Sequence, residues 1–192
     1  PPQHVDLPLG TISHPVTLDF ERRGDWLFYP ETVNHVKNGS FEMFAAGNFA
    51  SWTKSAVLTL TQGTGVRGSS AIITATNTGG IYQDIVIPNG TACTISIYAK
   101  VVSGPDLAYL QCFDYGGFLN VQTVTTAATG VTRISAHKTA ASGGIRVLVA
   151  AVAGMVVEFD LVQVEDGATA TEWVPSISSF IATSTAATIP SV

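Results

Sequence analysis

The sequence predicts an all-β protein in which two antiparallel sheets pack face to face as a sandwich or jelly roll. From Val36 onward, strand-length segments recur about every ten residues, and turn clusters rich in Gly, Asn, Pro and Ser separate them. Several of these segments alternate apolar and polar residues with period two. No segment carries the apolar stripe of a helix, so the sequence favours sheets alone.

The alternation is clearest over residues 94–101, which place four apolar side chains on one face: Ile95, Ile97, Ala99 and Val101. Tyr98 falls on the polar face of this segment. Residues 145–151 and 155–164 alternate in the same way, and in the second of these Glu158 and Asp160 share a face. The other predicted strands are residues 36–44, 56–60, 70–75, 81–87, 108–113, 118–125 and 131–136.

The composition divides the chain into three parts. Residues 1–35 contain five prolines and are predicted to form an extended N-terminal arm, with a short strand at residues 16–20. The arm also carries a bulky aromatic set that we interpret as an assembly anchor: Phe20, Trp26, Phe28 and Tyr29. A disordered leader is the alternative for this arm. Residues 36–175 form the predicted sandwich domain, and residues 176–192 form a Ser/Thr/Ala-rich tail or linker.

Charge and hydropathy exclude several classes of protein. Hydrophobic residues make up 46% of the chain, charged residues 12%, and the net charge is −5 without a run of Lys or Arg. Nucleic acid is therefore not expected as a partner, because phosphate binding needs a basic stripe. Membrane insertion is not expected either, because no segment of about 18 apolar residues occurs, and no signal peptide is visible. Cys93 and Cys112 are expected to be buried thiols rather than a disulfide.

The sequence offers little that would support catalysis. The four histidines are scattered, and no metalloprotease, nucleophile-elbow or paired-cysteine motif occurs. The stretch from Gly63 to Gly68 imitates a nucleotide-binding loop, but no helix is predicted to follow it. We therefore expect a protein that is not an enzyme.

Three separated pieces of the sequence resemble the carbohydrate-binding-module jelly roll of the family 4/9 type, which is galactose-binding-like in fold. They are the opening Asn38-Gly39-Ser40-Phe41-Glu42, the middle pair of residues 81–85 and 91–100, and the closing Asp160-Leu161-Val162-Gln163-Val164-Glu165. The ending that runs from Gln163 through Thr171 and Trp173 to Pro175 is similar to that of bacteriophage tail and virion proteins that carry such a domain.

A glycan site on such a sandwich needs aromatic rings that stack on sugars, and the candidates are Tyr82, Tyr98, Tyr115 and Phe118. The alternative for these residues is that they seal the edge of the sandwich. Trp52 and Trp173 are expected to lie in the core. The resemblance also implies a structural calcium ion held by Glu42 and Asp160, and no other cofactor.

Together these observations predict a bacteriophage virion structural protein, either a tail-fibre module or a capsid decoration protein. Its expected partners are other virion proteins and further copies of itself, as a homotrimer, together with a host cell-surface glycan, and its expected location is the virion. The alternative is a carbohydrate-binding module appended to a secreted glycoside hydrolase.

Overall fold

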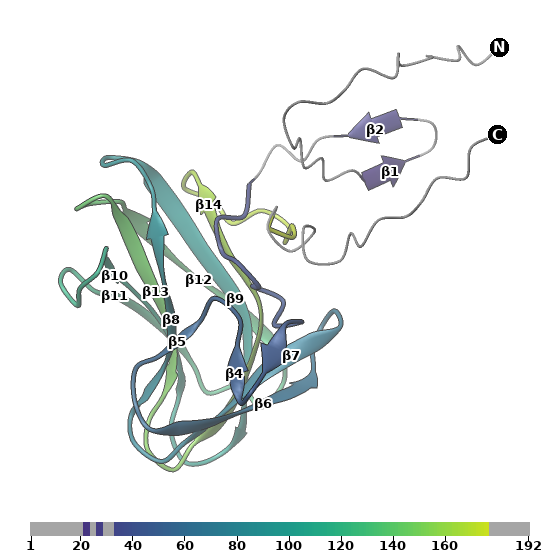
Figure 1. Ribbon diagram of the computed structural model, residues 1–192, viewed down its shortest axis with the longest axis vertical. Coiled ribbons are helices and arrows are strands. Elements are labelled where there is room, and N and C mark those ends of the chain that lie inside the picture. The colour runs from purple at the N-terminus through teal and green to yellow at the C-terminus, as the bar shows by residue number, and fades with distance from the viewer. Residues whose placement is uncertain (1–20, 24–25, 29–32, 177–192) are drawn as a thin grey trace.

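The computed structural model describes residues 21–23, 26–28 and 33–176, and every regular element among them is a strand (Figure 1). Two five-stranded antiparallel sheets form a sandwich. We call the sheet of order β11-β10-β13-β8-β5 the β8 sheet, and the sheet of order β12-β9-β14-β7-β6 the β9 sheet. No helix among the described residues is long and apolar enough to cross a membrane.

The β8 sheet contains β5 (Thr53–Lys54), β8 (Gly79–Val86), β10 (Ala108–Asp114), β11 (Gln122–Thr126) and β13 (Gly144–Ala151). The β9 sheet contains β6 (Leu58–Thr64), β7 (Ser69–Ala75), β9 (Ala92–Ser103), β12 (Thr132–Thr139) and β14 (Val156–Asp166). Two hairpins complete the description: β1 (Glu21–Arg23) with β2 (Trp26–Phe28), and β3 (Phe44–Ala45) with β4 (Asn48–Phe49).

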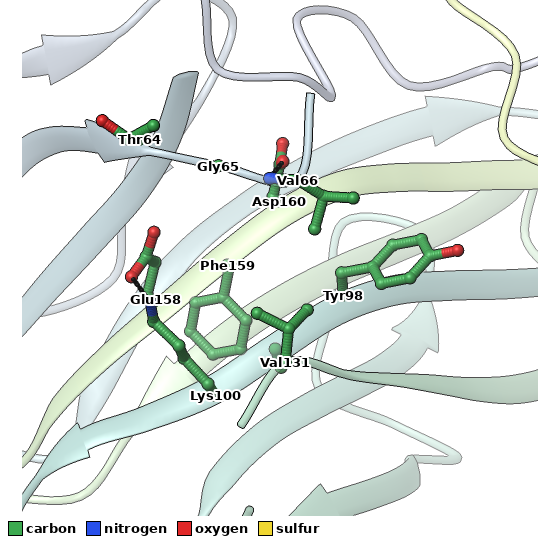
Figure 2. Close-up of a pocket in the computed structure, with 10 residues that line it drawn as sticks. Thr64, Gly65, Val66, Tyr98, Lys100, Val131, Glu158, Phe159 and Asp160 are labelled. Atoms are coloured by element: carbon green, nitrogen blue, oxygen red, sulfur yellow. Dashed lines mark hydrogen bonds and ion pairs between the residues drawn. The ribbon is translucent and has the colours of Figure 1, made fainter. Parts of the chain in front are cut away.

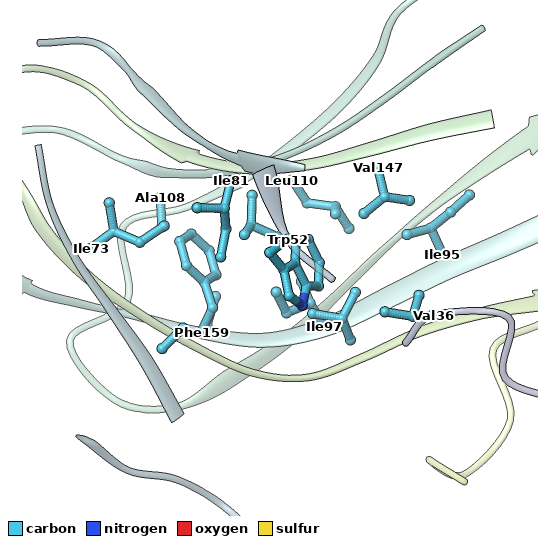
Figure 3. Packing of buried hydrophobic residues seen from close by; sticks show 14 of the residues in the cluster. Val36, Trp52, Ile73, Ile81, Ile95, Ile97, Ala108, Leu110, Val147 and Phe159 are labelled. Carbon is cyan, nitrogen blue, oxygen red and sulfur yellow. The ribbon is translucent and has the colours of Figure 1, made fainter. Parts of the chain in front are cut away.

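The core lies between the two sheets, and both contribute alternate residues to it (Figure 3). Ile81, Leu110 and Val147 come from the β8 sheet, while Ile97 and Phe159 come from the β9 sheet. Trp52 closes the same cluster, as the sequence predicted, and its indole N–H donates to the carbonyl of Asn38 at 3.1 Å. The predicted all-β sandwich is confirmed, because period-two burial defines an inner and an outer face on each sheet.

One predicted strand is wrong. Residues 36–43 form turns and irregular backbone rather than a strand, because Asn38 and Phe41 have φ values of 52° and 57°, which an extended strand does not allow. The Asn38 side chain fixes this turn, since its amide bonds the backbone of Met43 and Ala50. The predicted strand over residues 118–125 also begins late, at Gln122.

Both cysteines are buried free thiols, as expected. Burial raises the pKa of Cys93 to about 11 and that of Cys112 to about 12.

The arm lies mostly outside the described residues. Trp26 and Phe28 belong to the backbone hairpin of β1 and β2. Phe20, Tyr29 and the predicted strand at residues 16–20 lie outside the described part, as do residues 177–192, so the assembly anchor stays a prediction.

Candidate functional site

The outer face of the β8 sheet gathers aromatic and aliphatic side chains around one arginine. Strand alternation turns Ile81 and Ile85 inward, so Tyr82 and Asp84 point outward from β8. The neighbouring strand β13 presents Arg146 and Leu148 on the same face, since Leu148 pairs in register with Tyr82 and Arg146 with Asp84. Tyr82 also packs against the small outer-face cluster that contains Phe113, Leu148 and Ala150.

Arg146 is the centre of this face. Its Nε and Nη2 donate to the two carboxylate oxygens of Asp84 at 2.9 and 2.7 Å, which is a bidentate pair. The guanidinium carbon lies 4.0 Å from the ring centroid of Tyr82 and 5.1 Å from that of Phe118. Both distances are within the range of cation–π attraction, so the arginine joins two rings from different segments.

The contact with Arg146 also sets the protonation of Asp84. The hydrogen bonds from Arg146 hold the pKa of Asp84 below its usual value, and the N–H of Gly116, at 3.1 Å, acts in the same direction against the cost of burial. The Gly116 contact also ties the β10–β11 loop to β8. In that loop Phe118 meets Phe113 edge-on, with ring centroids 5.0 Å apart.

The rings near Arg146 remain partly open to solvent. The Phe118 ring is 60% exposed, and the rings of Tyr82 and Tyr109 are half-buried. The aliphatic side chain of Leu119, next to Phe118, is 72% exposed. Rings of this kind can stack on the apolar face of a sugar, and the side chains of Asp84, Tyr109 and Gln111 supply hydrogen-bonding groups nearby.

The structure brings some of the predicted glycan residues together and separates another. Tyr82 and Phe118 both contact Arg146, and Tyr115 belongs to the same β10–β11 loop as Phe118. Tyr98 points outward from β9, so it lies on the opposite side of the sandwich. Alternation also places Asp84 on the face of Tyr82, but sequence reasoning missed Arg146, although a single arginine in the apolar run of residues 145–151 was a usable signal.

Tyr98 borders a small hollow of about 80 Å³ on the outer face of the β9 sheet (Figure 2). Lys100 and Glu158 form an ion pair across its floor at 2.6 Å, and Ser70 Oγ donates to Glu158 at 2.6 Å. Arg133 lies over the Tyr98 ring at 5.6 Å. The polar groups of this hollow are thus largely paired with each other.

The two predicted calcium ligands meet at the turn between β6 and β7. Asp160 Oδ2 accepts from the N–H of Val66 at 2.6 Å, and Glu42 accepts from the N–H and hydroxyl of Ser69, both at 2.8 Å. Glycine is favoured here, because a Cβ on Gly65 would lie 2.6 Å from the Ser69 carbonyl oxygen and Gly68 has a φ of 70°.

Burial raises the pKa of Asp160 to about 6. Backbone N–H donors oppose this shift, and the nearby charge of Glu42 adds to it. No ion pair joins Asp160 or Glu42 to a Lys or Arg side chain in the described part of the chain. The local charge therefore suits a cation, although the loop turns N–H groups toward both carboxylates. No group of three or more metal-ligating His, Cys, Asp or Glu side chains occurs among the described residues.

We compared the chain with known proteins by sequence and by structure, and the matching structures share one fold. No protein-family model matches the sequence, and no curated protein matches it. Among solved structures, the enzymatically active domain of bacteriophage CBA120 tailspike protein 4 matches with a TM-score of 0.54 and 14% identity. That match covers 70% of this chain and 22% of the tailspike chain.

Carbohydrate-binding modules match in the same way. The Clostridium thermocellum endo-1,4-β-D-xylanase 10B modules, complexed with xylohexaose, match with a TM-score of 0.54 and 19% identity over 74% of this chain and 30% of theirs. The module TmCBM61, complexed with β-1,4-galactotriose, matches with a TM-score of 0.51 and 18% identity over 70% of this chain and 99% of its own. The sandwich described here therefore has the jelly-roll fold of carbohydrate-binding modules.

Proposed function

We propose that this protein binds glycan, without catalysis, through the outer face of the β8 sheet, and that it does so as a structural component of a bacteriophage virion. The observation that carries the glycan-binding part is the contact of Arg146 with both the Tyr82 ring and the exposed Phe118 ring. The guanidinium is fixed by Asp84, so the two rings are held in place before a ligand arrives. Such preorganisation reduces the entropy lost on binding.

The test is a pair of matched tyrosine variants. Tyr82 and Tyr98 are both half-buried, both contact an arginine, and lie on opposite outer faces. A glycan array with the wild-type protein identifies the ligand. With that ligand, Tyr82→Ala should weaken binding about 10–100-fold in calorimetry, the loss expected for one stacked ring by analogy with base stacking.

Tyr98→Ala is the control and should leave the affinity unchanged. Equal losses in both variants, or an array without signal for the wild-type protein, would remove glycan binding at this face.

The proposed virion role requires the protein to assemble with copies of itself and with other virion proteins. The match to the tailspike domain favours this role. In this proposal the protein is a tail-fibre module or capsid decoration protein that forms a homotrimer, and residues Phe20, Trp26, Phe28 and Tyr29 dock onto neighbouring subunits or virion proteins. Asn34 and His35 bond to β14, so the informative truncation removes residues 1–32 and spares them. The truncated protein should keep its sandwich but lose trimers in light scattering. Trimers of unchanged stability would contradict the role of the arm.

A carbohydrate-binding module appended to a secreted glycoside hydrolase is the second candidate, favoured by the match to the xylanase modules. The two candidates differ in what surrounds the domain. A hydrolase domain in the same gene would support this candidate, and incorporation of the protein into purified particles would support the virion role.

Calcium belongs to the same proposal as a structural ion held by Glu42 and Asp160. If calcium binds there, it should raise the melting temperature of the protein relative to EDTA, because a ligand that binds only the folded state stabilises it. Asp160→Asn should abolish this rise. An identical melting temperature in calcium and in EDTA would exclude the ion.

A further inference from the structure

The segments by which the chain enters and leaves the sandwich meet beside β14. We call residues 33–37 the incoming segment and residues 167–176 the outgoing segment. Strand β7 pairs with β14 only over Val156–Phe159, and beyond that point the register of β14 on β9 shifts between Asp160 and Gln163. The incoming chain takes the vacated position, since His35 N donates to the Val164 carbonyl at 2.9 Å.

One buried side chain joins both segments to β14. Asn34 is 4% exposed, and its Nδ2 donates to the carbonyls of Val162 and Val174 at 3.1 and 3.0 Å. Its Oδ1 accepts from the N–H groups of Val36 and Val164 at 3.0 and 3.2 Å. These four contacts use both N–H donors and both oxygen lone pairs of the Asn34 amide, which is the full hydrogen-bonding capacity of an asparagine side chain.

The closing motif holds the outgoing segment from the other side. Gln163 and Glu165 point outward from the β9 sheet, yet both are fully buried beneath that segment. Glu165 accepts from the N–H of Thr171 at 2.9 Å and from its hydroxyl at 2.6 Å, and Gln163 Oε1 accepts from the N–H of Val174 at 2.7 Å. Buried polar groups are costly unless paired, so these residues require the outgoing segment to stay in place.

We propose that Asn34, Gln163, Glu165 and Thr171 form a latch that fastens the incoming and outgoing segments to each other and to β14. The chain therefore enters and leaves the sandwich beside β14 of the β9 sheet. The face that carries Tyr82 and Arg146 belongs to the other sheet and points away from this attachment. The latch is independent of glycan binding, because none of its members lies on that face.

Hydrogen–deuterium exchange of the full chain tests the latch. Asn34→Ala removes all four amide contacts, so exchange should accelerate at least about tenfold in the incoming segment (residues 33–37) and the outgoing segment (residues 167–176) together. Peptides from β10 and β13 should keep their protection. Loss of protection in the incoming segment alone would overturn the proposal, because it would mean that the two segments open separately.

Two further variants separate the latch from general loosening. Thr171→Val removes the hydroxyl that donates to Glu165 at 2.6 Å and accepts from Gln163 Nε2 at 3.2 Å, but keeps the backbone N–H contact to Glu165. It should therefore produce a weaker acceleration in both segments. Arg67→Ala removes an exposed ion pair with Glu172 of the same segment, at 3.2 Å, and should change neither. If Arg67→Ala loosens the outgoing segment as much as Asn34→Ala does, the cluster of Asn34, Gln163, Glu165 and Thr171 is no latch.

Discussion

The two outer faces of the sandwich are built from the same alternating strands, but the chain treats them differently. On the β9 sheet four polar residues of the outer face are completely buried: Thr94, Ser96, Gln163 and Glu165. Thr94, Gln163 and Glu165 bond to the outgoing segment, and Ser96 accepts from Arg133. On the β8 sheet the outer face is aromatic and aliphatic, and Phe118 and Leu119 stay largely exposed. A face whose polar groups are satisfied by its own chain has little left for a ligand. The face with exposed rings retains apolar area that a ligand can still bury.

The two faces also differ in how ionisation affects their acids. Asp84, on the β8 sheet, has a bidentate arginine partner, and its pKa is lowered. Asp160, on the β9 sheet, is desolvated and has backbone N–H partners, and its pKa is raised. Ionisation of Asp84 is therefore coupled favourably to folding, whereas ionisation of Asp160 opposes folding.

The largest expected effect on stability concerns the outer face of the β9 sheet, where the outgoing segment packs. Glu165→Ala leaves the N–H of Thr171 and the amide of Gln163 without their buried acceptor, and should lower the free energy of unfolding by about 3 kcal/mol. Urea denaturation followed by circular dichroism measures the change. The affinity for glycan should stay at the wild-type value. A decrease of less than about 0.5 kcal/mol would show that the contacts of Glu165 with the outgoing segment contribute little to the free energy of unfolding.

The raised pKa of Asp160 predicts a pH dependence. Its folded pKa of about 6 lies above the usual 3.8, so the folded state holds the proton longer and the stabilising contribution falls as pH rises from about 4 through 6. In EDTA, the unfolding free energy of Asp160→Asn relative to wild type should therefore rise by about 2 kcal/mol between pH 4 and pH 7. Unfolding curves at several pH values test this, and a flat difference would contradict it.

The sequence pattern predicted some strands of the two sheets correctly and failed for others. Burial does not alternate along β13 or β14, whose residues are nearly all buried on both faces. Period-two patterning of the sequence nevertheless identified β9, β13 and β14 as strands. It failed at residues 36–44, since the left-handed backbone of Asn38 and Phe41 depends on hydrogen bonds to Met43 and Ala50 that the local pattern does not encode.

The candidate site was predicted only in part, for a related reason. Alternation places both Tyr82 and Tyr98 on outer faces, but it cannot assign a strand to one sheet or the other. That assignment depends on non-local strand order, in which β8 pairs with β13 and β9 pairs with β14. The partnership of Arg146 with Tyr82 arises from the same long-range pairing.

A smaller effect is expected for the ion pair on the open face. Asp84→Asn removes the charge that holds Arg146, and should lower the free energy of unfolding by about 1 kcal/mol at pH 7, since the pair is partly screened by solvent. The sign follows from the lowered pKa: this stabilisation is present above the unfolded pKa and is lost as pH falls through the folded one. The difference between the two proteins should therefore shrink in acid, and a difference that grows below pH 4 would refute this assignment.

The smallest effect on stability is expected for Phe118, where the effect on binding should be clear. The ring is 60% exposed and contacts Phe113 and Arg146, so Phe118→Ala should change the free energy of unfolding by less than about 1 kcal/mol. Its removal nevertheless takes away one of the two rings that contact Arg146, so glycan affinity should fall about as far as in Tyr82→Ala. Calorimetry with the ligand found for the wild type, alongside urea denaturation, separates the two quantities. A Phe118→Ala variant that unfolds more easily than Glu165→Ala would mean that this face supports the fold instead of remaining open for a ligand, and the contrast between the two faces would then fail.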